Sequence, residues 1–450
     1  MQTLIEQIPE NIKSKLKTLN DNGFEAYIVG GAVRDLLLNT EPNDYDIFTN
    51  ATGKQILEVF PNGVVIGAEE RQKKILTVVV DGVEVSQYRQ NGDRTEVGNN
   101  LKTHLSTCDF TINAIALGLD GELIDLYFGE DCLKNHYLRT VGSPYERIEE
   151  DKLRVLRAIR FMLKYNLMTD GELQEVILYS NIEDLPQERV TEELMKIIKY
   201  PKAIYALDAY GLLTQIFPEL SEFYRLEGGE HHGETVLRHL TFAFEKACEI
   251  SSDEHFKLAC LLHDVGKGKT RDDTSGETHF LQHEVVGADL IEQIGTRLKW
   301  STELISYLKF MVKRHMFGYM EEPSKKAYAN LFAEMESLHI PIQHLVGMNY
   351  CDMQANLKKP RMGLLDFMIN NKVHQKYYEM KYTKEPFKVM DLAIRGQDLL
   401  DLGMNPGVNV GKILNEAFDL VLDGVLLNNR AILMNWLRNR IQIRKDGKYG

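Results

Sequence analysis

The chain has 450 residues, which is too long for one compact core and predicts roughly two to four domains. Apolar residues make up 44% of it and charged residues 26%, the ordinary balance of a globular protein. The formal net charge of −13 argues against a general nucleic-acid coat protein, which would be basic. It leaves room for an RNA substrate held by a local basic patch.

The first residues contain no apolar signal core, and no run approaches the ~18 uninterrupted apolar residues of a membrane span. The five cysteines are scattered and form no CxxC pair. These features predict a cytoplasmic protein in a reducing compartment, with no membrane association, no disulfide framework and no zinc ribbon.

In chain order, residues 1–20 are expected to form an amphipathic helix, and residues 25–128 mix α and β patterns. Within them, ILTVVVDGVEVSQYR (75–89) has two β-rich runs around Asp81-Gly82, a strong hairpin signal, and ELIDLYF (122–128) is a further strand. After about residue 140 helical periodicity dominates. The pattern predicts an α+β chain: a small N-terminal head with a mixed or antiparallel sheet, followed by an elongated all-helical body.

The stretch VGGAVRDLLLNTEPNDYDIF (29–48) says most about function. Gly30 and Gly31 join an apolar strand to a helical run, a junction that lets backbone N–H groups approach phosphate. Asp44 and Asp46 are expected on one face of a strand, about 6–7 Å apart, where they suit Mg²⁺. Glu84, on a neighbouring strand, is a candidate third acid. The stretch predicts a site for a metal-bound nucleoside triphosphate.

GGAVRD followed by DYD resembles the head signature of class II nucleotidyltransferases, in the branch with the bacterial tRNA CCA-adding enzymes and poly(A) polymerases. The resemblance implies that Asp44 and Asp46 are catalytic Mg²⁺ ligands and that Gly30, Gly31 and Arg34 bind the nucleotide.

CDFTINAIAL (108–117) is a second resemblance and implies nucleotide-binding roles for Asp109 and Asn113. The family carries Arg-Arg before this aspartate, whereas Thr107 and Cys108 stand here. The change removes at least one charge-assisted contact, worth ~1.5–3 kcal/mol. Arg94 or Lys102 is a possible substitute, and the sequence leaves the choice open.

EEDKLRVLRAIRF (149–161) places Asp151, Arg154 and Arg157 along one stripe of an expected helix. Asp151 and Arg154 are either a surface ion pair or a base reader. The carboxylate would accept from the exocyclic amine of cytosine or adenine, and the guanidinium would donate to a ring nitrogen or to the cytosine carbonyl. The stretch resembles the family's EDxxR motif, which implies base reading by this pair.

The same resemblance places Arg157 and Arg160 near the phosphates or sugar. In PQERVTEELMKII (186–198), it implies that Arg189 and Glu193 are structural braces.

His263-Asp264 follows an apolar helical run and resembles the signature of HD-type phosphohydrolases. The resemblance implies four further ligands: His239, either His279 or His283 (we choose His283), His315 and Asp352. Such a set would bind a divalent transition metal that can activate water. In the family this domain either hydrolyses phosphoesters or mainly holds RNA. The segment 391–425 also resembles the family's tail.

The expected domains are a nucleotidyltransferase head, a helical neck with the base-reading helix, an HD-type domain and an RNA-binding helical tail, over 1–140, 141–205, 206–375 and 376–450. The expected function is addition of C and A (CCA) to the tRNA 3′ end from CTP and ATP with Mg²⁺. Alternatives are an A-adding enzyme, a CC-adding enzyme, a poly(A) polymerase, an HD phosphohydrolase with a degenerate head, or a non-catalytic RNA-binding protein.

Overall fold

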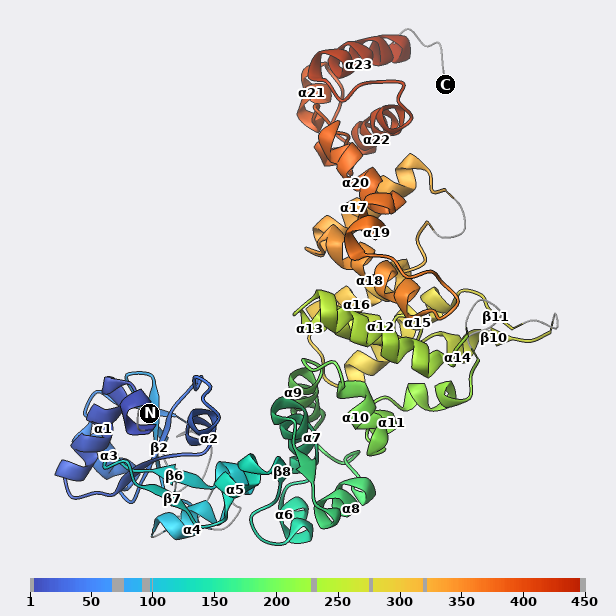
Figure 1. The fold of residues 1–450 in the computed structure, drawn as a ribbon. Helices are drawn as coiled ribbons and strands as arrows, with labels where there is room; N and C mark the ends of the chain where they lie inside the picture. The colour runs from blue at the N-terminus through green and yellow to red at the C-terminus, as the bar shows by residue number, and fades with distance from the viewer. Residues whose placement is uncertain are drawn as a thin grey trace. The chain divides into compact units, whose positions relative to one another are not determined.

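The computed structural model describes residues 4–66, 77–90, 98, 100–227, 233–274, 278–318 and 322–445, with side chains to residue 441 (Figure 1). The chain forms two compact units, Met1–Ile216 and Phe217–Gly450, and each is considered by itself. Among the described residues, no helix combines the length and the apolar character that crossing a bilayer requires.

A seven-stranded sheet organises the first part of unit 1, with strand order β3-β4-β5-β2-β1-β6-β7. The β2–β5 pair is parallel and the other neighbours are antiparallel, which confirms the mixed sheet expected from the sequence. The strands are β1 (Ala26–Val29), β2 (Asp46–Thr49), β3 (Val64–Ile66), β4 (Thr77–Val80), β5 (Val83–Gln87), β6 (Ile115–Leu117) and β7 (Leu123–Asp125).

The predicted hairpin is present, because Asp81 (φ 48°) and Gly82 (φ 80°) both adopt the left-handed conformation that a tight β4–β5 turn needs. The predicted N-terminal helix begins only at Glu10, after Pro9. It buries Ile12, Leu16 and Leu19, as its amphipathic pattern requires.

Helices make up most of the remainder of unit 1. They are α1 (Glu10–Asp21), α2 (Gly31–Leu37), α3 (Gly53–Val59), α4 (Leu101–Leu105), α5 (Gly129–Lys134), α6 (Pro144–Glu150), α7 (Arg154–Tyr165), α8 (Gly171–Tyr179), α9 (Gln187–Ile197), α10 (Ala203–Ala209) and α11 (Leu213–Ile216). Two short 3₁₀ helices, η1 (Leu4–Gln7) and η2 (Thr111–Asn113), and the two-residue strands β8 (Tyr137–Leu138) and β9 (Met168–Thr169) complete it.

We expected one continuous helix over 149–161. This prediction was wrong, because the helical conformation is interrupted at Asp151, between α6 and α7. Asp151 is extended (φ −155°, ψ 97°), and its Oδ1 accepts from the Leu153 backbone N–H at 3.1 Å. An aspartate side chain that satisfies a nearby backbone donor favours a helix start over a helix interior. Asp151 therefore precedes the helix that carries Arg154 and Arg157.

The regular structure in the described part of unit 2 is helical apart from the two-residue strands β10 (Arg271–Asp272) and β11 (His279–Phe280), so the expectation of a helical body is confirmed. Its first helices are α12 (Val236–Ile250), α13 (Glu254–Leu262), α14 (Lys267–Thr270), α15 (His283–Arg297), α16 (Thr302–Arg314), α17 (Lys325–Ser337) and α18 (Ile342–Ala355). The remaining ones are α19 (Leu364–Asn370), α20 (Lys372–Tyr382), α21 (Gly396–Asp401), α22 (Val408–Leu422), α23 (Arg430–Lys445) and the 3₁₀ turns η3 (Pro218–Tyr224) and η4 (Val389–Asp391).

Candidate functional site

The glycine pair forms the turn between β1 and α2. Gly30 has φ +88° and ψ −126°, a conformation that strains any residue with a Cβ, and its N–H donates to the Ile115 carbonyl at 3.2 Å. Gly31 begins α2. This turn aims the start of α2, and therefore Arg34, into the site.

The two predicted metal ligands lie at the start of β2. Asp46 is its first residue, whereas Asp44 precedes the strand, so the placement of both in a strand was wrong. Asp46 is in register with Glu84 of the parallel strand β5, which brings the third predicted acid alongside. Burial, followed by the charges of Asp44 and Glu84, raises the Asp46 pKa to about 6, while Arg89 opposes the rise. Asp44 and Asp46 both line the cleft, and a divalent cation bound there would offset the carboxylate repulsion that raises the Asp46 pKa.

Arg34 is a buried cation on α2. Its Nε donates to Asp35 Oδ1 at 3.0 Å, its Nη1 donates to Asn113 Oδ1, and its guanidinium lies 4.6 Å from the Tyr165 ring centroid. The Tyr165 hydroxyl in turn donates to Asp35 Oδ1 at 2.9 Å. These contacts fix Arg34 between the head and α7.

Asp109 is held by its neighbours in the cleft wall. Its carboxylate accepts from Arg157 Nε at 2.7 Å, from Asn113 Nδ2 at 2.9 Å and from the Phe110 N–H at 2.9 Å. Burial raises its pKa, but the Arg157 charge and these hydrogen bonds outweigh burial and leave the pKa below its ordinary value. Asp109 therefore positions Arg157 and Asn113.

The predicted base readers, Asp151 and Arg154, are each held by another partner. Arg189 Nη2 donates to Asp151 Oδ2 at 2.7 Å, and Arg154 Nη1 donates to Glu150 Oε2 at 2.6 Å. Burial raises the Asp151 pKa, but the Arg189 hydrogen bond, with other contacts, lowers it overall.

The second predicted brace, Glu193, is buried. It accepts from Arg160 Nε at 2.7 Å and from Lys196 at 3.0 Å, so it joins α9 to α7. Arg160 also packs over the Phe161 ring, 4.4 Å from its centroid.

One cleft of about 860 Å³ collects these side chains in unit 1. The predicted residues that line it are Gly30, Gly31, Arg34, Asp44, Asp46, Asp109, Asn113, Asp151, Arg154, Arg157 and Arg160. Further lining residues that sequence reasoning missed include Phe48, Arg89, His104 and Phe161. Phe48 could have been predicted from the sequence, since it lies two residues after Asp46 and therefore on the same face of the strand.

Where the family carries two arginines, Thr107 and Cys108 also line this cleft. Burial, followed by the nearby Asp109 charge, raises the pKa of the Cys108 thiol to about 12. Of the two substitutes considered from the sequence, Lys102 is exposed on α4, and Arg94 lies outside the described residues.

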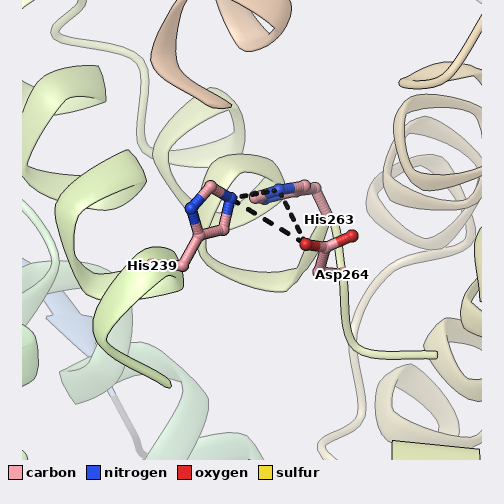
Figure 2. A group of neighbouring side chains, drawn as sticks. All are labelled: His239, His263 and Asp264. Atoms are coloured by element: carbon pink, nitrogen blue, oxygen red, sulfur yellow. Dashed lines mark hydrogen bonds and ion pairs between the residues drawn. The ribbon is translucent and has the colours of Figure 1, made fainter. Parts of the chain in front are cut away.

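All six predicted ligands of the second site meet in unit 2. They come from α12 (His239), the end of α13 (His263, Asp264), the start of α15 (His283), the end of α16 (His315) and α18 (Asp352). Figure 2 shows His239, His263 and Asp264 pointing toward one another. His279, the alternative to His283, lies on β11 with its side chain exposed.

Asp264 stands between two ligand groups, His239–His263–Asp264 and Asp264–His283–His315. Its Oδ2 lies 3.4 Å from His263 Nε2, and its Oδ1 lies 3.1 Å from His283 Nε2. Asp352 Oδ1 lies 3.0 Å from His239 Nε2 on the first side. A carboxylate with its two oxygens facing two imidazole pairs has the form of a bridging ligand.

The imidazoles are oriented by oxygen acceptors behind them. The Nδ1 atoms of His239, His263, His283 and His315 lie 2.7–3.2 Å from Glu234 Oε1 and from the carbonyls of Cys260, Phe280 and Val312. Each acceptor favours a proton on Nδ1 and leaves the Nε2 lone pair facing the centre, as metal ligation requires. Burial lowers the His263 pKa, but Asp264 and Asp352 raise it to about 10. The same negative field favours bound cations, so the residues fit divalent metals.

Comparison with known families accounts for both sites. Residues 26–139 match the family described as "Poly A polymerase head domain", 178–224 match "Probable RNA and SrmB- binding site of polymerase A", and 235–343 match "HD domain". The unit 1 cleft and the unit 2 centre thus lie mainly in two separately recognised domains.

Two relatives match most of this chain, and a third matches less than half of it. The CCA-adding enzyme of Lactobacillus helveticus is 36% identical over 94% of this chain and 95% of its own length. The A-adding tRNA nucleotidyltransferase of Deinococcus radiodurans is 31% identical over 91% and 95%. The CCA-adding enzyme of Oceanobacillus iheyensis is 38% identical, over 41% of this chain and 48% of its own length.

Solved structures support the fold. The Bacillus stearothermophilus CCA-adding enzyme in complex with CTP has a TM-score of 0.63 at 21% identity, over 99% of this chain and 100% of that one. The Thermotoga maritima CCA-adding enzyme complexed with tRNA has a TM-score of 0.56 at 19% identity, over 98% and 100%. With a full-length relative above 30% identity, the chain belongs to the class II nucleotidyltransferase family of the CCA-adding enzymes.

Proposed function

We propose that this chain adds C and A to the 3′ end of tRNA, using CTP and ATP. The tRNA 3′-hydroxyl attacks the α-phosphate of the nucleotide, the new phosphodiester forms, and pyrophosphate leaves. The Lactobacillus helveticus relative, named a CCA-adding enzyme, supports this substrate assignment.

One observation carries the proposal: a single cleft joins the acids of the sheet to the polar residues at the start of α7. Nucleotidyl transfer needs a charged platform for the phosphates and a base-selective contact at a fixed distance from it. Asp44 and Asp46 supply the first, and Asp151 and Arg154 supply the second.

Asp44 and Asp46, with Glu84 beside them, would hold Mg²⁺. When bound, the ion neutralises charge that develops on the phosphates and favours in-line attack. Gly30 and Gly31 leave room for the phosphate chain to approach the backbone.

Asp151 accepts from the exocyclic amine of cytosine or adenine, and Arg154 donates to the ring nitrogen or to the cytosine carbonyl. Guanine and uracil present the reverse pattern at these positions, so the pair rejects them. Arg189 fixes the Asp151 carboxylate at 2.7 Å, which keeps the pair in place before the nucleotide enters.

Arg34, Arg157 and Arg160 surround Phe161, with guanidinium carbons 4.4–5.5 Å from its ring centroid. We assign them, with Asn113, to the phosphates and sugar of the nucleotide. Asp109 positions two members of this group. The chain divides on this proposal into a nucleotidyltransferase head (1–140), a base-reading neck (141–205), an HD-type domain (206–375) and an RNA-binding tail (376–450).

The test uses a tRNA that lacks its 3′ CCA, with Mg²⁺ and CTP alone, ATP alone or both, and reads the products on a sequencing gel. We expect two added residues with CTP and three with both. Growth with ATP alone into a long ladder would identify a poly(A) polymerase, and addition of A only to a tRNA that already ends in CC would identify an A-adding enzyme.

Asp46→Ala should abolish addition, whereas the matched control Glu58→Ala, an exposed acid on α3, should leave it intact. Equal activity of the two variants would contradict the metal assignment.

A second activity, phosphoester hydrolysis at the unit 2 centre, is favoured by the two ligand groups that share Asp264. We propose two divalent transition-metal ions there, whose chemistry is activation of water for attack on phosphorus. Hydrolysis of bis-p-nitrophenyl phosphate with Mn²⁺ or Ni²⁺ should be lost in Asp264→Ala and kept in Asp46→Ala. No hydrolysis by the wild-type chain with any divalent metal would overturn this activity and leave nucleotide addition untouched.

We also place the protein in the cytosol. All five cysteines are free thiols, as a reducing compartment allows.

A further inference from the structure

Arg89 lies one residue beyond the hydrogen-bonded end of β5, where the Tyr88 N–H donates to the Thr49 carbonyl at 2.9 Å. It lines the same cleft as the acids. Its guanidinium packs over the Phe48 ring, 5.5 Å from the centroid. Phe48 and Asp46 are two residues apart on β2 and share a face, so the Arg89 guanidinium lies on the strand face that carries Asp46.

The Arg89 backbone is fixed from two sides. Its N–H donates to His104 Nδ1 at 3.4 Å, and Gly98 lies so close that a side chain there would collide with the Arg89 carbonyl oxygen. His104 is buried and stacks on Phe48 with ring centroids 4.0 Å apart. Arg89 therefore projects from a rigid aromatic support, which is the arrangement a preorganised ligand-binding cation needs.

The arginines that line the cleft contact different groups. Arg34, Arg157 and Arg160 gather around Phe161, and Arg154 and Arg189 are held by Glu150 and Asp151. Arg89 packs on Phe48 instead, and its charge opposes the rise of the Asp46 pKa and, with Arg147 and Arg154, that of the Cys108 pKa. Its field thus spans the metal acids and the position where the sequence comparison leads one to expect an arginine.

We propose that Arg89 binds the triphosphate of the incoming nucleotide and supplies the cationic contact that Thr107 and Cys108 cannot make. This assignment rests on the proposed nucleotide addition and names a further binding residue for it. A guanidinium suits the role because it donates two parallel hydrogen bonds to phosphate oxygens, which an ammonium group cannot do.

The test compares the affinity of the full-length protein for CTP and CMP by calorimetry in Mg²⁺, for the wild type, Arg89→Gln and Arg89→Lys. The expected result is roughly 10- to 100-fold weaker CTP binding in Arg89→Gln, a partial loss in Arg89→Lys, and CMP binding within about threefold of the wild type. ATP should follow CTP. An equal loss for CTP and CMP would show that Arg89 acts only on the structure of the pocket and would overturn the proposal.

Lys102→Gln is the matched control, since it removes one exposed charge from α4 of the same head. It should leave CTP affinity unchanged. Weaker CTP binding in Lys102→Gln together with normal binding in Arg89→Gln would assign the contact to Lys102 and contradict the proposal.

A rescue experiment tests whether an arginine at position 107 or 108 can replace Arg89 in binding CTP. Cys108→Arg, or Thr107→Arg if the partly buried Cys108 site does not accept an arginine, should restore CTP affinity at least tenfold in the Arg89→Gln background and add less in the wild type. Equal gains in both backgrounds would contradict a shared ligand. A wild-type chain that binds CTP but extends no tRNA would overturn the proposed function and leave this assignment standing.

Discussion

Asp151 and Arg154 are single residues whose side chains are positioned by neighbours in the cleft. Each is held by a further side chain, Arg189 and Glu150 respectively, at 2.7 Å and 2.6 Å. These neighbours thus set the positions of both groups for the base-reading role that we propose. Preorganisation of this kind increases selectivity because less ordering remains to be done on binding.

Replacement of Asp151 by Ala should lower kcat/KM for CTP and ATP by roughly 10- to 100-fold, since one good base contact is worth about 1–3 kcal/mol. Incorporation of UMP and GMP should rise relative to CMP and AMP, with KM for tRNA unchanged. Glu149→Ala, which removes an exposed neighbouring carboxylate, is the control. Unchanged base selectivity in Asp151→Ala would exclude a base-reading role.

The folding stability of the head should depend on pH through His104. Burial, followed by the Arg89 charge, lowers its pKa to about 3, whereas an unfolded histidine titrates near ~6.5. The unfolded chain therefore takes up the proton first. The stability that His104 contributes is full above about pH 6.5 and falls as the pH drops toward 3.

Between pH 8 and 5 this loss amounts to about 2 kcal/mol. The thermal unfolding midpoint of the wild type should fall more steeply with acid than that of His104→Gln, which cannot take up the proton. Parallel pH profiles for the two proteins would contradict the buried, neutral state of this imidazole.

At the scale of elements, the register of β2 against β5 and the break between α6 and α7 create the site. Parallel pairing places Glu84 beside Asp46, and the break at Asp151 places a carboxylate at the entry to α7. The β4–β5 hairpin was predictable from Asp81-Gly82, because few residue pairs accept that turn. The break was missed because its neighbours are good helix formers, whereas Asp151 adopts an extended backbone and its side chain accepts from the Leu153 N–H.

The α7–α9 pair depends on buried Glu193, which accepts from Arg160 and Lys196. Glu193→Gln should reduce the free energy of unfolding by roughly 1–3 kcal/mol, since Arg160 loses its charged acceptor. Glu188→Gln, at an exposed position on the same helix, should change it by less than about 0.5 kcal/mol. Denaturant unfolding measures both, and equal stability of the two variants would contradict a bracing role for Glu193.

In the molecule as a whole, the nucleotidyltransferase cleft lies in unit 1, and the candidate metal centre, for which we propose a second chemistry, lies in unit 2. The sequence predicted the sheet-containing head and the helical body, and the family resemblance picked out six side chains that meet in unit 2. It did not predict that Asp264 would lie between two candidate ligand groups, or that Arg89 would line the same cleft as Asp46. Both depend on segments far apart in the chain that meet only after folding.

The second centre should bind about two divalent ions per chain, measured by elemental analysis after loading and desalting. Asp264→Ala should lose both ions, because each ligand group includes Asp264. Asp289→Ala, an exposed acid on α15, should keep them. Chelation should lower the unfolding midpoint of the wild type but not of Asp264→Ala, since bound metal stabilises only the folded centre. One ion per wild-type chain would refute the bridging arrangement.

If one cleft selects first C and then A for a tRNA end, the added residues must depend on where that end stops, so all four nucleoside triphosphates are offered to tRNAs that lack CCA, CA or only the final A. We expect C-C-A, C-A and A as the added residues, respectively, with addition ending there and absent in Asp46→Ala. Addition of U or G at comparable rates, a product that ignores the existing end, or full activity of Asp46→Ala would contradict it.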